Sequence, residues 1–194
     1  MLGQKVLEKL TPEQLAAAFP ASFKSDAIVA AQVVVDMLAA KQWTGRYQLA
    51  SGGGATLIPS RLRFDIEHFD EAALTSEQVL MVRALLTKST DGFIRQRAAQ
   101  SLLLKPTHLV FPFIVGLLGE YVIEILHDIN AALPNFDPEV VRSFIIENPA
   151  YYRLTKDRIA SYWNCYYRQT VTRRQYVGFQ VARAFDQMAK IHLR

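Results

Sequence analysis

Apolar residues recur with a helical period over most of this 194-residue chain, which predicts amphipathic helices that pack on one another. Four of these helices are preceded by a residue whose side chain can accept hydrogen bonds from the first helical turn: Thr11, Thr75, Asp91 and Asp137. The pattern predicts about eight helices joined mostly by short loops. The last two are expected at residues 150–170 and 174–192.

The period changes from helical to alternating between residues 45 and 67. Apolar and polar side chains alternate there in two stretches, as in strands buried on one face: Tyr47 and Leu49, then Leu62, Phe64 and Ile66. Between them, the sequence SGGGA can turn the chain, and Pro59 restricts its strand to an edge or a bulge. We therefore expect a β-hairpin or an irregular β-ribbon over residues 45–67. The glycines are not expected to bind phosphate, because no Gly-Lys-Ser/Thr ending follows them.

The segment DGFIRQRAAQSLL resembles the first helix of a HEAT-type repeat, in which an Asp caps the helix and an apolar residue and an Arg follow. The matching positions are Asp91, Ile94, Arg95, Ala98 and Leu102. A weaker copy, DPEVVRSF, begins at Asp137, 46 residues after Asp91, with Arg142 one place late. The resemblance implies one unit near residues 91–133 and a partial second near 137–170, which are too few for a stable solenoid alone.

The sequence therefore predicts a mainly α protein: a multi-helix bundle, or a short HEAT-like helical array, with one small β-ribbon. The length suits one domain, or at most two small ones, and we expect a single domain. In this domain residues 1–44 form N-terminal helices, residues 45–67 the ribbon and residues 75–194 the helical core.

Nothing in the sequence marks the chain for secretion or for a membrane. Its first segment, MLGQKVLEKL, lacks the charged and apolar regions of a signal peptide. The single cysteine, Cys165, excludes an internal disulfide. The uncharged run at residues 109–119 is shorter than the roughly 20 residues that span a bilayer. We expect a protein of the reducing cytoplasm with no membrane contact.

Positive charge is concentrated near the end of the sequence. The whole chain carries a net charge of +4. Residues 1–149 hold 13 Lys and Arg against 16 Asp and Glu, a net of −3, whereas residues 150–194 hold 9 against 2, a net of +7. Such a surface attracts an acidic protein face or a nucleic acid, and it also suits the solvated sides of two helices.

The segment EYVIEILHDIN, residues 120–130, has the composition of a metal site. Glu124 and His127 have the Glu-x-x-His spacing of di-iron helical bundles, and the His-Asp pair resembles that of the HD phosphohydrolases. On a helical projection, however, these side chains and Glu120 lie opposite the apolar stripe and face solvent. A second Glu-x-x-His is also missing from the sequence. We therefore expect no metal site and no cofactor.

One face of the helix predicted at 150–170 is aromatic. The side chains on that face are Tyr152, Ile159, Tyr162, Trp163, Tyr166 and Tyr167. Aromatic residues at helical spacing most often form core, but this face also suits a protein-binding surface or a platform for nucleic-acid bases.

The predicted partner-binding residues are four arginines in the basic region: Arg153, Arg168, Arg173 and Arg174. The last two stand at the predicted start of the final helix, where positive charge opposes the helix dipole. A residue that is locally unfavourable for folding is a candidate for function.

The favoured function is a non-enzymatic protein-binding module of the adaptor, inhibitor or toxin-neutralising type, whose partner has an acidic surface. No set of residues in the sequence converges on a reaction, and no histidine supports Cys165 as a nucleophile. One alternative is a nucleic-acid-associated protein that uses the basic C-terminal helices, with Arg61 and Arg63 on the ribbon. The other is an enzyme of unrecognised type. The sequence does not predict an oligomeric state.

Overall fold

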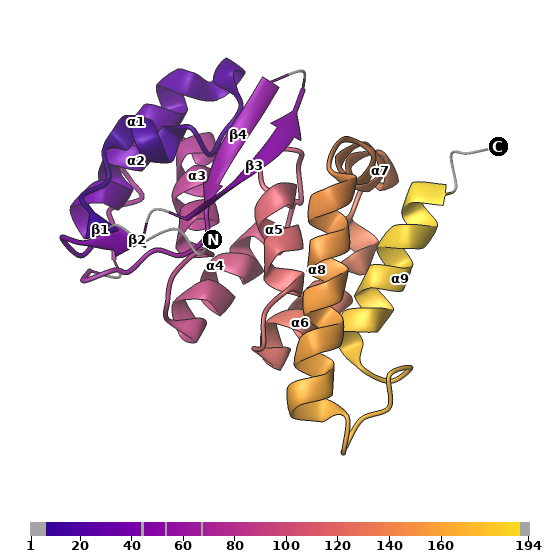
Figure 1. Cartoon of the computed structure of the whole chain (residues 1–194). Coiled ribbons are helices and arrows are strands. Elements are labelled where there is room, and N and C mark those ends of the chain that lie inside the picture. The colour runs from indigo at the N-terminus through magenta and orange to yellow at the C-terminus, as the bar shows by residue number, and fades with distance from the viewer. Residues whose placement is uncertain (1–6, 44, 53, 67, 191–194) are drawn as a thin grey trace. The chain divides into compact units, whose positions relative to one another are not determined.

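Residues 7–43, 45–52, 54–66 and 68–190 are described by the structure, a computed structural model (Figure 1). This part of the chain contains nine α-helices and four short strands, and its one longer strand pair is a β-hairpin. The predicted fold class, mainly α with one small β-ribbon, is confirmed. The first six residues of the opening segment MLGQKVLEKL lie outside the described residues. So do residues 191 and 192, the last two of the predicted final helix.

The chain divides into two compact units, Met1–Ala98 and Ala99–Arg194. The boundary falls within helix α4, Gly92–Leu103. The expectation of a single domain stays a prediction.

The first unit contains three helices before α4 and all four strands. They are α1 (Pro12–Ala16), α2 (Lys24–Met37), α3 (Ser76–Leu86), β1 (Leu7–Glu8), β2 (Gln42–Trp43), β3 (Arg46–Ser51) and β4 (Gly54–Pro59), with a 3-10 turn at Ala21–Phe23. Helix α2 contacts both α1 and α3. Its buried residues recur every three or four positions, from Ala27 through Ala30 and Val34 to Met37, as the helical period requires.

The predicted ribbon is a hairpin with a different second strand. Strand β3 pairs antiparallel with β4, so that Ser51 lies opposite Gly54. The turn uses Gly52 at φ +56°, a conformation that favours glycine. The prediction of a strand at residues 62–66 is wrong. The tight turn at Gly52 pairs β3 with the segment that directly follows it, β4. Residues 62–66 bond elsewhere instead: Leu62 N–H donates to the Lys88 carbonyl and Asp65 N–H to the Met37 carbonyl. Positions 53 and 67 of the predicted ribbon lie outside the described residues.

All four predicted helix caps are confirmed. Thr11 and Thr75 each form a reciprocal capping box with the glutamine three residues later. The Asp91 carboxylate accepts from the N–H groups of Phe93 at 2.7 Å and Ile94 at 3.2 Å. The Asp137 carboxylate accepts from the Glu139 N–H at 2.9 Å. These caps satisfy N–H groups that have no partner within the helix.

The second unit contains helices joined by turns and loops, with no strand among its described residues. After α4 come α5 (Phe111–Leu118), α6 (Ile123–Ala131), α7 (Pro138–Glu147), α8 (Pro149–Tyr162) and α9 (Val177–Lys190), with a 3-10 turn at Leu133–Asn135. Every residue of α5 is buried. The rings of Phe111, Phe136 and Phe185 lie 5.1–5.8 Å apart in the core. Helices α8 and α9 lie side by side, joined at one end by a loop (Figure 1).

The boundaries of the last two helices differ from the prediction. Helix α8 passes at Trp163–Tyr167 into one π-helical turn, and α9 begins only at Val177. The indole N–H of Trp163 donates to the Val171 carbonyl at 2.8 Å and ties down the connecting loop. A turn closed by Thr172 and Gln175, whose side chains bond at 2.7 Å, then precedes α9. Arg173 and Arg174 therefore lie in this turn and not in the first turn of the helix.

No helix among the described residues combines the length and the apolar composition needed to cross a membrane.

Candidate partner-binding groove

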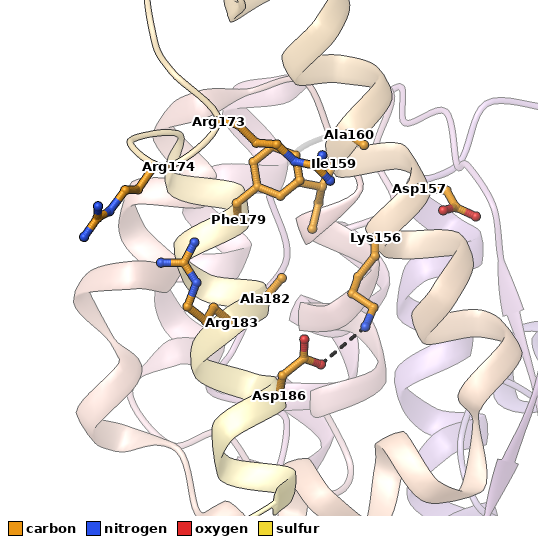
Figure 2. Close-up of a pocket in the computed structure, with 10 residues that line it drawn as sticks. All are labelled: Lys156, Asp157, Ile159, Ala160, Arg173, Arg174, Phe179, Ala182, Arg183 and Asp186. Carbon is orange, nitrogen blue, oxygen red and sulfur yellow. Dashed lines mark hydrogen bonds and ion pairs between the residues drawn. The ribbon is translucent and has the colours of Figure 1, made fainter.

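A groove of about 690 Å³ runs between α8 and α9 in the second unit (Figure 2). We call it the α8–α9 groove. Its floor is apolar and is formed by Ile159, Ala160, Phe179 and Ala182. Ile159 and Ala182 are buried, whereas Ala160 and Phe179 are half-buried. The two alanines leave room above the floor.

A hydrogen bond and a ring contact position the two helices beneath the groove. The Tyr152 hydroxyl on α8 donates to the Ala182 carbonyl on α9 at 3.0 Å. Burial, and then the charge of Asp186, raise the pKa of Tyr152 far above its usual range, so this donor keeps its proton. At the other end the Trp163 and Phe179 rings meet edge to face, with centroids 6.0 Å apart.

The rim of the groove carries four cations. Arg173 stacks its guanidinium over the Phe179 ring, 4.7 Å from the centroid. Lys156 forms an ion pair with Asp186 at 3.4 Å and lies 4.7 Å from the Tyr152 ring centroid. Arg174 and Arg183 are exposed and have no ion-pair or hydrogen-bond partner within the described ranges. Figure 2 shows these two side chains extending to the same side of the groove.

The groove is positively charged overall. Its four cations are opposed by two carboxylates, Asp157 and Asp186, which leaves a net charge of +2. The Lys156–Asp186 pair is neutral, so the excess comes from the arginines. A positive rim beside an apolar floor strengthens the local potential, because the floor excludes water. The groove is therefore suited to a ligand that is both acidic and apolar.

The structure brings together only two of the four predicted arginines. Arg173 and Arg174 line the groove. Arg153 is exposed on α8 and is not among the lining residues. Arg168 follows the π-helical turn, where its guanidinium donates to the Asn164 Oδ1 at 3.1 Å beside a smaller, separate hollow.

Sequence reasoning missed Lys156, Arg183 and Phe179 as members of this site. Arg183 lies on the polar side of a predicted helix. That position predicts an exposed side chain but does not predict a partner-binding site. Lys156 meets Asp186 across two helices, 30 residues apart in the chain. Only the pairing of α8 with α9 reveals that these residues share one groove.

The aromatic face of α8 is divided. Tyr152 and Ile159 are core residues, as the most common pattern predicts. Tyr166 in the π-helical turn is 65% exposed. Its ring lies 6.1 Å from Tyr162 and 6.4 Å from Tyr121, which is 49% exposed. The second half of the face is therefore a surface of tyrosine rings.

The segment at 120–130 is not one helix, because α6 begins at Ile123. Glu124 and His127 are exposed while Ile125 is buried, so the predicted orientation of this part is confirmed. The solvent-facing prediction for Glu120 is wrong: it is 6% exposed, because it lies in the turn after α5 and not on the helix used for the projection. Within the described ranges, no three His, Cys, Asp or Glu side chains are grouped so as to hold a metal ion.

No protein-family model, curated protein or solved structure matches this chain. The resemblance of residues 91–103 to a HEAT-type helix therefore rests on the sequence pattern alone and stays a prediction.

Proposed function

We propose that this protein is a non-enzymatic binding module, of the adaptor, inhibitor or toxin-neutralising type, that holds an acidic surface of a protein partner in the α8–α9 groove. The proposal places this binding in the cytoplasm, as the sequence suggests. The observation that carries it is the pair Arg174 and Arg183, two exposed arginines without an internal partner beside an apolar floor.

Charge and composition support a protein ligand. Arginine and aromatic residues are enriched in protein interfaces, and arginine can bond a carboxylate through two N–H groups at once. Phe179 and Arg173 already stack on each other, so part of the surface is ordered before binding. An ordered surface loses less entropy when the partner binds.

The experiment compares two charge-reversal variants with equal change in net charge. The groove variant is Arg173→Glu with Arg174→Glu, and the matched control is Arg153→Glu with Arg168→Glu, whose residues do not line the groove. Proteins captured by the wild type from the native cytoplasm are identified by mass spectrometry after nuclease treatment. The affinity of each purified candidate is then measured with all three proteins.

The proposal expects a partner that survives the nuclease, binds the wild type and the control alike, and is weakened by the groove variant. Equal loss in both variants would mean that only net charge matters. Capture that disappears with nuclease, together with a steep dependence of affinity on salt, would favour the nucleic-acid alternative. Full binding by the groove variant would exclude this site.

A further inference from the structure

We infer that the segment held by the α8–α9 groove is a short amphipathic helix with acidic residues along one side. This inference rests on the proposed function and specifies the partner of the same site. It follows from three properties of the groove: the walls that it offers, the length of its lining and the distribution of its charges.

The walls favour a helical occupant over an extended one. Both walls are helices, α8 and α9, whose main-chain groups bond within the helix. An extended segment on this floor would find no strand edge to pair with, and its own N–H and C=O groups would lose water without replacement bonds. A helix satisfies those groups internally and presents only side chains. The small side chains of Ala160 and Ala182 allow its backbone to approach closely.

The lining sets the length of the occupant. Along α9 it extends from Phe179 to Asp186, which is eight residues, or about 10 Å from the first to the last at 1.5 Å per residue. The Lys156–Asp186 ion pair lies at the Asp186 end of this lining. About two helical turns fit this length, so the apolar contacts come from positions i, i+3 or i+4, and i+7 of the bound helix.

The charges set the rotation of the occupant about its axis. Figure 2 shows Arg174 and Arg183 extending to one side of the groove and Asp157 to the other. Carboxylates on the bound helix are attracted to the arginine side and repelled by Asp157. The acidic residues therefore flank the apolar stripe on one side only, and this asymmetry distinguishes the inference from a general affinity for negative charge.

The test uses synthetic peptides of about 15 residues, with a side-chain link that stabilises the helix because short free helices are marginal in water. The first peptide has leucines at i, i+3 and i+7 with glutamates along one side. The second has the same composition in scrambled order, and the third has a proline in the middle. Affinity is measured by fluorescence anisotropy. The bound site is located by NMR of the Ala160 and Ala182 methyl groups.

The inference expects the first peptide to bind at least about tenfold more tightly than the other two and to shift both alanine methyl signals. Arg183→Glu and Ala160→Leu should each weaken it by about tenfold, the first by removing charge and the second by filling the floor. Arg153→Glu should leave it unchanged. Melting temperatures of all variants verify that they are folded.

Three results overturn the inference. They are equal binding of the scrambled peptide, no effect of Ala160→Leu in a folded protein, and no binding of the first peptide at about millimolar concentration. If the captured partner still depends on Arg173 and Arg174 in those cases, the proposed function stands and only the helical occupant is excluded. If the partner is also indifferent to these arginines, both proposals fail.

Discussion

Two arginines of the first unit and two of the second are used in opposite ways. In the first unit Arg95 is 1% exposed and its guanidinium donates to the carbonyls of Ser89 at 2.8 Å and Thr90 at 3.1 Å. Arg83 there holds both oxygens of Glu71 at 2.8 Å. In the second unit Arg174 and Arg183 are exposed beside the α8–α9 groove. Whether an arginine can meet a partner therefore depends less on net charge than on whether the fold already bonds its guanidinium.

The largest expected effect is on the buried arginine. Arg95→Ala removes the donors to two carbonyls and leaves a cavity, which should lower the free energy of unfolding by about 2–4 kcal/mol. Chemical denaturation measures this change. Arg153→Ala, on the surface of α8, serves as the control and should change stability by less than about 0.5 kcal/mol. An equally small effect of Arg95→Ala would remove the contrast between the two uses of arginine.

A smaller effect is expected from the hydroxyl that ties α8 to α9. Tyr152→Phe deletes the hydrogen bond to the Ala182 carbonyl beneath the groove and should cost about 1–2 kcal/mol, because the carbonyl is left without this donor. Thermal unfolding measures the loss. A variant as stable as the wild type would mean that this bond does not hold the groove together.

The stability of the protein at alkaline pH should depend on Tyr176, a buried tyrosine that is 1% exposed. Burial, and then the neighbouring Tyr167, raise the pKa of Tyr176 from 10.0 to about 12. The unfolded state therefore loses this proton first as pH rises. The stability contributed by the neutral phenol is fully present below pH 10.0 and is lost as pH rises to about 12. Between pH 10.0 and about 12 the free energy of unfolding of Tyr176→Phe should fall less steeply than that of the wild type. An identical fall in both proteins would contradict the claim that ionisation of Tyr176 causes it.

The smallest stability effect is expected from the groove arginines. Arg173→Glu with Arg174→Glu loses the stacking of Arg173 on Phe179, worth about 0.5–1 kcal/mol. Negative charge near the start of α9 offsets part of this loss through the helix dipole, by at most about 0.3–1 kcal/mol per charge. Because α9 begins three residues after Arg174, the dipole gain is smaller than the predicted helix boundary implied. Denaturation should show a net change within about 1 kcal/mol, and a larger loss would make these residues structural.

Local features of this fold are predictable from sequence, and non-local ones are not. Thr11, Thr75, Asp91 and Asp137 were correct caps because a cap depends on the next three residues. The alternation at residues 62–66 did not identify a strand, because pairing is decided by the turn at Gly52 and by partners such as Lys88. An alternating pattern describes which faces are apolar but not where the main-chain bonds go.

The candidate site shows the same limit. The charge excess after residue 149 indicated a basic surface and included Arg173 and Arg174. It also included Arg153 and Arg168, which the fold places outside the groove. Lys156 and Arg183 became part of the site only through the antiparallel pairing of α8 with α9, which no local pattern encodes.

The most direct test of this account is the partner's affinity for two variants of equal net charge, Arg173→Glu with Arg174→Glu and Arg153→Glu with Arg168→Glu. It is measured by calorimetry with both variants verified as folded. The account predicts that the first variant loses at least about tenfold in affinity while the second stays within about twofold of the wild type. Equal affinities for the two variants, whether both are lowered or both unchanged, would contradict the claim that the α8–α9 groove is the binding site.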